Sequence, residues 1–443
     1  MDIKLPISVE KIINTLQENG YEGYAVGGCV RDTVLGRTPQ DWDITTSAQP
    51  MQVKSLFPHT IDTGIQHGTV TVMDQHIGYE VTTYRIDGEY EDARHPKEVT
   101  FTSNLAEDLK RRDFTINAMA YNHEHGMVDL FDGQKDLKRH VIRCVGNPME
   151  RFSEDALRML RAVRFAAQLN FEIEEETRAA IKALAPTIKK VSAERIQVEM
   201  VKLLTSDHPE KIRDAYELGL TAQFLPEFDK LMETTQNSKH HMYTVGEHTI
   251  KAMENIQNDK VLRLTMLLHD IAKPVCKITD KKGDDHFNGH QEEGAKMAKS
   301  ILKRLKFDNA TINDVVMLIK AHDHRPEISQ RNVRFAIYEN GIDCYPRLFS
   351  VKKADTLAQS EYKREEKLKY IEEYADTYNE IMKKNQCVSR KTLAVNGNDL
   401  LKAGVEPGKK IGELLEKLFL EVLEDPNANN KEVLLEKLKK ENV

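Results

Sequence analysis

Two aspartates, Asp41 and Asp43, stand two residues apart shortly after a glycine pair, Gly27-Gly28. Side chains at positions i and i+2 of an extended segment point to the same face of a sheet, so both carboxylates can reach one pair of divalent cations. Mg²⁺ prefers oxygen ligands and commonly also holds substrate phosphates. The aspartates therefore predict a strand that presents a metal site. The alternative for an Asp-x-Asp pattern is a solvated turn.

The glycine pair favours the metal site over a solvated turn. Gly27 and Gly28 allow a close approach of the backbone and leave N–H groups that can hold a triphosphate. Arg31 can neutralise the charge of such a group. Glu80, in a segment with strand composition, would add a third carboxylate if it is not simply an exposed strand residue. Together these residues predict a Mg²⁺-dependent site for nucleotidyl transfer.

The chain changes character near residue 145. Before this point, short β-branched and aromatic segments alternate with turn residues, which predicts a small mixed sheet with helices. The strands are expected at residues 24–26, 43–45, 68–73 and 79–85. After residue 145, apolar residues recur with the helical period of about 3.6. We expect an α+β protein with a head, a neck, a body and a tail, at residues 1–145, 146–235, 236–375 and 376–443.

Composition excludes some classes of protein. The chain has 443 residues, of which 40% are hydrophobic and 30% charged, as in a soluble globular protein. It has no apolar run of the ~18 residues that a membrane span needs, and its start does not resemble a signal peptide, so we expect it in the cytoplasm. Its five cysteines stand singly, which argues against disulfides and zinc fingers. With a net charge of −7, nucleic acid would have to bind at local basic patches.

A helix is expected at residues 107–120, and it would offer polar side chains to the same site. Guanidinium groups of the Arg111-Arg112 pair suit a triphosphate, and Asn117 suits a ribose hydroxyl. Adjacent arginines on a helix are otherwise ordinary surface charges.

A third motif runs from Glu154 to Arg164, with Asp155, Arg158, Arg161 and Arg164 at three-residue spacing. On one helix these side chains would form a slanted stripe whose neighbours meet, and an ion-pair ladder is one interpretation. Base recognition is the other. Cytosine and adenine each present an amino donor beside a ring-nitrogen acceptor, whereas uracil and guanine present a carbonyl beside a ring N–H. An Asp acceptor beside an Arg donor therefore fits only the first two bases.

These motifs, in this order over residues 20–230, resemble the class II tRNA nucleotidyltransferases. These CCA-adding enzymes belong to the DNA polymerase beta-like superfamily, together with bacterial poly(A) polymerases. The segments that carry the resemblance are Gly27-Gly28-x-Val30-Arg31-Asp32, Asp41-x-Asp43, Arg111-Arg112-Asp113-Phe114-Thr115-Ile116-Asn117-Ala118, Glu154-Asp155-x-x-Arg158 and Ala193-Glu194-Arg195. The fold implied is a polymerase beta-like nucleotidyltransferase head followed by helical domains.

The resemblance also implies roles for individual residues. Metal ligands would be Asp41 and Asp43, and residues that touch the triphosphate and sugar would be Gly28, Arg31 and Arg112. Asp155 and Arg158 would select the base, with Arg161 and Arg164 close to the nucleotide. Glu194 and Arg195 resemble a structural brace. Residues 87–96 are similar to the flexible segment of the family, and their presence favours full CCA addition over CC addition alone.

The expected function is the addition of C, C and A to tRNA 3′ ends from CTP and ATP, with tRNA as partner and with neither a membrane nor DNA involved. A poly(A) polymerase and a partial A- or CC-adding enzyme share the same chemistry and stay open as alternatives. Two further alternatives belong to other classes. One is a phosphohydrolase with an inactive head, and the other is a non-catalytic tRNA-binding protein. Near the C-terminus, glycine turns at residues 396–401 and 404–412 resemble the tail of the family and suit RNA phosphates.

The body carries a separate motif, Leu267-Leu268-His269-Asp270-Ile271-Ala272-Lys273-Pro274, with Gly289-His290 downstream. It resembles the HD phosphohydrolase domain. The resemblance implies a divalent metal held by four residues, which are His248, His269, Asp270 and Asp355, with His290 and His322 as ligands for a second ion. Mixed imidazole and carboxylate ligands suit Mn²⁺, Ni²⁺, Co²⁺ or Fe²⁺. The alternative is a helical scaffold that only binds tRNA.

Overall fold

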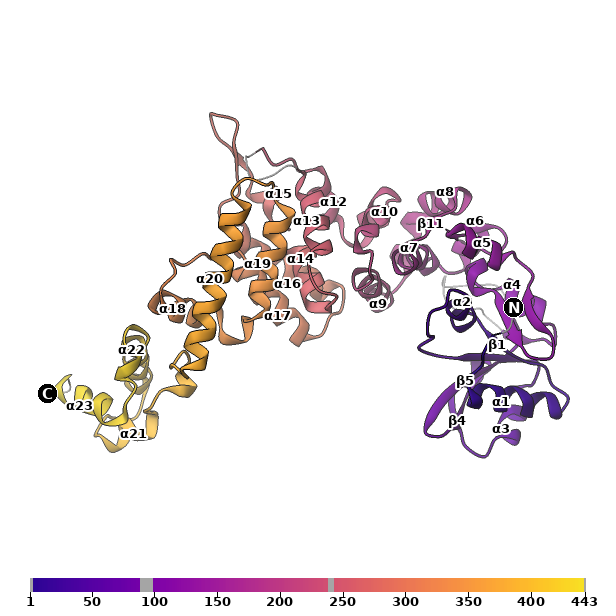
Figure 1. Ribbon diagram of the computed structural model, residues 1–443, viewed down its shortest axis with the longest axis horizontal. Helices are drawn as coiled ribbons and strands as arrows, with labels where there is room; N and C mark the ends of the chain where they lie inside the picture. The colour runs from indigo at the N-terminus through magenta and orange to yellow at the C-terminus, as the bar shows by residue number, and fades with distance from the viewer. Residues whose placement is uncertain (1–2, 88–98, 238–242, 442–443) are drawn as a thin grey trace. The chain divides into compact units, whose positions relative to one another are not determined.

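The computed structural model describes residues 3–87, 99–237 and 243–441, which divide into two compact units (Figure 1). The first unit, Met1–Pro226, combines a sheet with helices, and the second, Glu227–Val443, is almost entirely helical. The expected α+β fold class is therefore confirmed. Within the described residues, we find no helix with the length and apolar character of a membrane span.

A seven-stranded sheet forms the centre of the head, in the order β3-β4-β5-β2-β1-β8-β9. The strands are β1 (Gly23–Val26), β2 (Asp43–Thr46), β3 (Thr60–Gly64), β4 (Thr69–Asp74), β5 (Ile77–Thr83), β8 (Met119–Asn122) and β9 (Gly126–Asp129). β2 pairs with β5 in parallel, and the other pairs are antiparallel. The sheet is mixed, as predicted, and its four predicted strands correspond to β1, β2, β4 and β5.

Helices and small strand pairs surround this sheet. They are α1 (Ile7–Glu18), α2 (Gly28–Val34), α3 (Pro50–Leu56), α4 (Leu105–Lys110), α5 (Gly133–Arg139) and the pair β6 (Arg85–Asp87) and β7 (Val99–Phe101). The central strand β1 is buried along its whole length. β1 and β2 consequently form a rigid base for the residues at their ends.

The prediction of one helix at residues 107–120 is wrong. α4 ends at Lys110, a 3₁₀ turn η2 covers Thr115–Asn117, and the chain then enters β8. The backbone bonds of this stretch go to a distant segment: Thr115 N donates to Arg143 O at 2.9 Å, and Val145 N donates to Asp113 O at 3.1 Å. Pairing with that segment and with β1 outweighs the local helical pattern.

The neck is helical but contains one break that the sequence pattern did not predict. Its helices are α6 (Pro148–Glu154), α7 (Leu157–Leu169), α8 (Glu175–Leu184), α9 (Ala193–Leu204), α10 (Ile212–Glu217) and α11 (Thr221–Phe224), and β10 (Val141–Ile142) pairs with β11 (Glu172–Ile173). Asp155 lies between α6 and α7 in an extended conformation, and its Oδ1 accepts a hydrogen bond from Leu157 N at 3.1 Å. It therefore precedes the helix that carries the three arginines.

The second unit consists of the end of the neck, the body and the tail. α12 (Pro226–Glu233) is the last helix of the neck range. The body contains α13 (Val245–Glu254), α14 (Lys260–Leu268), α15 (Lys273–Cys276), the hairpin β12 (Ile278–Thr279) and β13 (Asp285–His286), α16 (His290–Arg304), α17 (Asn309–Ala321), α18 (Gln330–Asn340), α19 (Arg347–Ala358) and α20 (Arg364–Lys383), which continues past residue 375. α13, α14, α17 and α19 pack against one another. The tail contains α21 (Gly397–Lys402), α22 (Lys409–Glu424) and α23 (Lys431–Glu441).

Arg334 of α18 connects the tail to the body. Its Nε and Nη2 donate to the carbonyls of Leu423 and Glu424 at 2.8 and 2.9 Å. These carbonyls end α22, where helix carbonyls have no partner within the helix. The tail also has a core of its own, in which Phe419 is fully buried.

Candidate functional site

The glycine turn of the head depends on Gly27 for two reasons. Gly27 has φ +82° at the start of α2, a region that side chains disfavour. A Cβ atom at this position would also lie 2.9 Å from Nη1 of Arg112. The turn therefore brings the Arg112 guanidinium against the start of α2, as a triphosphate site requires.

Three carboxylates stand beside this turn. Asp43 begins β2, Asp41 lies two residues earlier, and Glu80 of β5 is the register partner of Asp43. A large part of each residue is exposed. Around the carboxyl group of Asp43, neighbouring protein atoms still displace part of the water. This partial desolvation and then repulsion from Glu80 raise the pKa of Asp43, whereas Arg112 opposes the rise. A bound cation would relieve this repulsion.

Within the described residues, groups of three ligand atoms within 4.8 Å of one another occur only in the body. The head carboxylates thus do not form a closed three-ligand group. Two carboxylates with substrate phosphates are the usual way in which proteins hold Mg²⁺, and Asp41 and Asp43 fit this arrangement. Glu80 as a third ligand stays a prediction.

A continuous hydrogen-bond network joins several residues predicted to bind nucleotide. Arg31 Nη1 donates to Asn117 Oδ1 at 2.8 Å, and Asn117 Nδ2 donates to Asp113 Oδ1 at 3.2 Å. Arg161 donates to Asp113 Oδ2 through Nε and Nη2, at 2.8 and 2.6 Å. Burial alone would raise the pKa of Asp113, but Arg161 and then Asn117 hold that pKa far below its usual range. Asp113 therefore stays charged between the Arg161 guanidinium and the Asn117 amide.

Phe165 and Glu199 complete this network and were not predicted from the sequence. The guanidinium carbons of Arg31, Arg161 and Arg164 lie 5.1, 5.4 and 3.7 Å from the Phe165 ring centre, within the range of cation–π attraction. Arg164 also donates to Glu199 of α9, and both side chains are buried. One feature of the sequence could have identified Glu199, namely its position as a carboxylate among the apolar residues that α9 buries.

Asp155 and Arg158 do not form the ion pair that was expected between neighbouring side chains on one helix. Asp155 is held by Arg195, whose Nη1 and Nη2 lie 3.2 and 2.7 Å from its two carboxylate oxygens. Arg158 donates to Glu154 at 2.6 Å and to the carbonyl of Arg111 at 3.2 Å. The expected ladder is therefore absent between Asp155 and Arg158, and separate partners fix the two side chains. Arg195 acts here as the brace that the sequence predicted.

Asp108 is a further residue that the sequence analysis missed. It is fully buried, accepts hydrogen bonds from Arg111 at 2.9 and 2.8 Å, and lies 3.5 Å from Arg112 Nη2. Thr45 Oγ1 of β2 contacts it at 3.2 Å. Asp108 thus fixes the arginine pair to the strand that begins with Asp43.

In the body, four buried histidines share one hydrogen-bond pattern, in which Nδ1 faces a backbone carbonyl. The pairs are His248 with Ala358 at 3.3 Å, His269 with Met266 at 2.8 Å, His290 with Phe287 at 2.8 Å and His322 with Ile319 at 2.6 Å. A neutral imidazole that donates through Nδ1 keeps a lone pair on Nε2. All four Nε2 atoms are therefore available as ligands.

These Nε2 atoms face each other in pairs. His248 and His269 approach to 3.3 Å, and so do His290 and His322. Two lone pairs at this distance repel unless a proton or a metal ion lies between them. Asp270 stands between the pairs, with Oδ2 3.2 Å from His269 and Oδ1 3.5 Å from His290. The result is two three-ligand groups that share Asp270.

Asp355 of α19 adjoins the first group, because its Oδ1 lies 2.9 Å from His248 Nε2. Burial alone would lower the pKa of His269, but Asp270 and then Asp355 raise it to about 10. The cluster thus attracts positive charge. Its imidazoles and carboxylates fit a pair of transition-metal ions, and the structure brings together every ligand predicted for the body.

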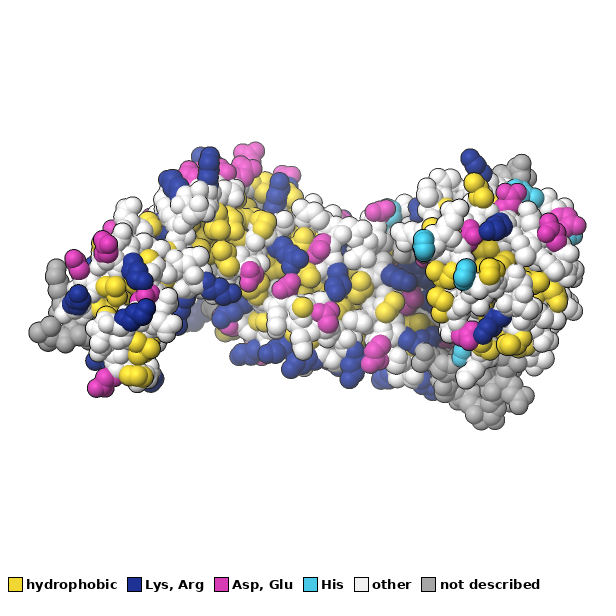
Figure 2. Space-filling model, turned by 90° about the horizontal axis from the view of Figure 1, so that it is seen from below, with side chains coloured by type: hydrophobic (Ala, Val, Ile, Leu, Met, Phe, Trp, Pro, Cys, Tyr) yellow, Lys and Arg dark blue, Asp and Glu magenta, His cyan; other side chains and the backbone are white. Residues whose placement is uncertain are grey.

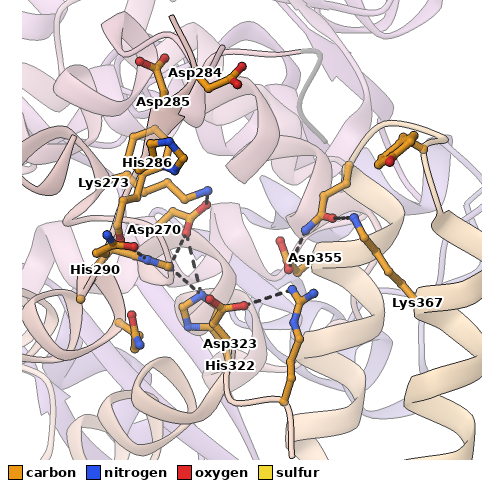
Figure 3. A pocket seen from close by; sticks show the side chains of 17 residues that line it. Asp270, Lys273, Asp284, Asp285, His286, His290, His322, Asp323, Asp355 and Lys367 are labelled. Atoms are coloured by element: carbon orange, nitrogen blue, oxygen red, sulfur yellow. Dashed lines mark hydrogen bonds and ion pairs between the residues drawn. The ribbon is translucent and has the colours of Figure 1, made fainter. Parts of the chain in front are cut away.

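A cavity of about 810 Å³ opens over this cluster (Figure 3). Side chains of both charges line it, with Lys273, Arg325 and Lys367 among several aspartates. Lys273 Nζ lies 2.7 Å from Asp270 Oδ2, and Figure 3 places Lys367 on the opposite side of the carboxylates. Elsewhere on the surface, Lys and Arg side chains gather along one margin of the helical part (Figure 2), so local basic patches exist despite the net charge of −7.

Three family models match the chain. Residues 23–143 match the "Poly A polymerase head domain", and residues 170–232 match the "Probable RNA and SrmB-binding site of polymerase A". Residues 290–438 match domain 2 of a tRNA nucleotidyltransferase family.

Named relatives cover nearly the whole chain. The CCA-adding enzyme of Levilactobacillus brevis is 39% identical over 96% of this chain and 95% of its own length. The CCA-adding enzyme of Enterococcus faecalis is 36% identical over 97% of this chain and 95% of its own length. The crystal structure of the Bacillus stearothermophilus CCA-adding enzyme with CTP shares 29% identity at a TM-score of 0.73, covering 99% of this chain and 98% of that one. The Thermotoga maritima CCA-adding enzyme, solved with tRNA, shares the fold at 21% identity. The TM-score is 0.60, and the match covers 99% of this chain and 100% of that one.

We expect the ion pair between Arg164 and Glu199 to stabilise the neck. Removing one partner of a buried pair leaves the other charge unpaired, so Glu199→Ala should lower the free energy of unfolding by about 3–5 kcal/mol. Urea denaturation of the full chain measures this. Lys202→Ala, at an exposed site on the same helix, is the matched control and should change the free energy by less than about 0.5 kcal/mol.

The double variant Arg164→Met/Glu199→Leu removes both charges and should recover much of the loss. Equal unfolding free energies for Glu199→Ala and Lys202→Ala would contradict the structural importance of the pair.

Proposed function

Because the chain belongs to the CCA-adding enzyme family of tRNA nucleotidyltransferases, we propose that it adds C, C and A to tRNA 3′ ends from CTP and ATP. The observation that carries this proposal is the position of Asp43, at the start of β2, beside a glycine turn that Arg112 closes. The cytoplasm, which holds tRNA and both nucleotides, is the compartment expected for this activity.

The reaction is an in-line substitution at the α-phosphate. The terminal ribose hydroxyl of tRNA attacks this phosphate, the bond to the β-phosphate breaks, and pyrophosphate leaves. Mg²⁺ bound by Asp41 and Asp43 would neutralise the charge that develops on the oxygens. Arg31 and Arg112 bind the triphosphate, and their orientation is fixed before substrate arrives, because Asn117 and Asp108 already hold them.

Base selection falls to Asp155 and Arg158. Arg195 holds the Asp155 carboxylate in place through two contacts, and Glu154 does the same for Arg158. Side chains that are held in this way can reject a base with the opposite donor and acceptor pattern. Residues 87–96, which favour full CCA addition, lie almost wholly outside the described residues, so complete CCA addition rests on the family relationship. Poly(A) addition and partial addition are the alternatives that a product analysis would detect.

Asp43→Ala should abolish nucleotide addition while tRNA binding persists. The reason is that Asp43 would hold the metal at the α-phosphate, whereas RNA affinity comes from Lys and Arg elsewhere. The assay follows the extension of tRNA that lacks its CCA end, with Mg²⁺ and single nucleotides, and a filter-binding assay follows tRNA affinity. Asp62→Ala, an exposed carboxylate on β3 of the same sheet, should leave both unchanged. Extension by Asp43→Ala above a few per cent of the parent rate would contradict the metal assignment.

Asp155→Ala should relax the choice of base. A lost hydrogen bond at the base edge should lower the discrimination against UTP and GTP by about tenfold or more, which corresponds to about 1–3 kcal/mol. The ratio of kcat/KM values for CTP and UTP measures this effect. If the variant loses activity equally with all four nucleotides, Asp155 has a structural role and does not read the base.

We also propose a second activity, metal-dependent hydrolysis of a phosphate ester in the body. Its support is the paired Nε2 atoms and the shared Asp270, which together offer sites for two ions. Metal at such a site lowers the pKa of bound water and so supplies a nucleophile. Lys273 lies beside Asp270 at the floor of the cavity, where it can bind an anionic phosphate.

The full chain should show weak hydrolysis of a generic phosphodiester with Mn²⁺, Ni²⁺, Co²⁺ or Fe²⁺. We expect this activity to survive in Asp43→Ala and to disappear in Asp270→Ala, because Asp270 is shared by both ligand groups. Metal content by mass spectrometry and release of product are the two measurements. A parent protein that holds no metal at this site and hydrolyses nothing with these four ions would reduce the body to a scaffold.

A further inference from the structure

One face of α19 contributes to both ligand groups of the body. Asp355 Oδ1 contacts His248 at 2.9 Å, and the carbonyl of Ala358, one turn later, accepts the Nδ1 hydrogen of His248 at 3.3 Å. Lys352 lies one turn earlier than Asp355. Residues three apart share a helix face, so Lys352, Asp355 and Ala358 form a single row along α19.

Lys352 reaches the turn that ends α17. Its side chain is buried, and Nζ donates to the carbonyls of His322 and His324 at 2.7 and 2.6 Å. The last carbonyls of a helix have no partner within the helix and attract a cation. Lys352 therefore caps the C-terminal end of α17 from a neighbouring helix.

This cap controls the direction of one metal ligand. His322 Nδ1 is fixed on Ile319 O at 2.6 Å, and Lys352 fixes the backbone on either side of Asp323. With ring and backbone both held, His322 Nε2 must point at His290 Nε2, 3.3 Å away.

We propose that Lys352 is the positioning residue for the ion held by His290, His322 and Asp270. Through the row on α19, it also ties this ion to the group formed by His248 and Asp355. Lys352 touches no ligand atom of the ion and acts only through the backbone carbonyls of His322 and His324. This inference rests on the proposed metal sites of the body.

Titration of the full chain with Mn²⁺ tests the proposal in an Asp43→Ala background, so that the head contributes no metal. We expect the parent to bind two ions and to give the spin-coupled electron paramagnetic resonance signal of a close Mn²⁺ pair. Lys352→Met should bind the second ion about 10- to 100-fold more weakly and give the spectrum of an isolated ion. His322→Ala, which removes the ligand itself, should give the same spectrum.

Two further variants separate positioning from folding. Lys353→Met changes the exposed neighbour on the same helix and should keep both ions and the coupled signal. Lys352→Arg retains N–H donors for the two carbonyls and should restore the coupled signal at least in part. Thermal unfolding without metal should be similar for all these proteins.

Three results would overturn the proposal. If Lys352→Met keeps the coupled signal with parental affinity for both ions, Lys352 has no role in positioning. If Lys352→Met loses both ions together with its thermal stability, the role of Lys352 is structural. In both cases this inference fails alone. If the parent binds no Mn²⁺, the metal sites of the body fail with it.

Discussion

The buried carboxylate of Asp113 is the interaction on which the geometry of the head depends. It accepts hydrogen bonds from Asn117 and from both donors of Arg161, and also from the backbone of Phe114. Through these contacts it fixes η2, which follows the arginine pair, to α7 of the neck. An unpaired charge in this position would be very unfavourable. The basic groups around it are therefore held in place by the need to neutralise Asp113.

The body uses a comparable arrangement around Asp270. This carboxylate is also buried, and it is approached by Lys273 and by histidines of both ligand groups. The two sites differ in their other groups. The head presents exposed carboxylates, which suit Mg²⁺ together with phosphates, whereas the body presents imidazole lone pairs in a buried setting, which suit softer ions. The two proposed sites thus differ in the exposure and type of their ligands, and therefore in the ions that they suit.

Much of this arrangement could be predicted from the sequence. The aspartate pair and the strands around it follow from local spacing, and so does the helical character of the chain after residue 145. The prediction was wrong at residues 107–120, because the backbone of this stretch pairs with residues 143–145 and with β1. No local pattern records such pairing.

Residues that act by holding others were the hardest to find. Asp108, Glu199 and Lys352 each bind a partner that the sequence analysis had singled out or its close neighbour. In the sequence they are ordinary charges on helices. Their importance comes from burial, which makes each unpaired charge costly, and burial of a single charged residue depends on how the helices pack.

The hydrogen bonds from the four histidines to backbone carbonyls affect how the ligand groups of the body could be gained or lost in evolution. For His269, His290 and His322, the carbonyl belongs to the residue three positions earlier, so Nδ1 of each ring is fixed by its own stretch of chain. For His322, Lys352 of α19 additionally holds the backbone. Replacing one of them removes a ligand without disturbing how the other two are oriented. A lineage could therefore lose the proposed metal sites stepwise and keep the helical body.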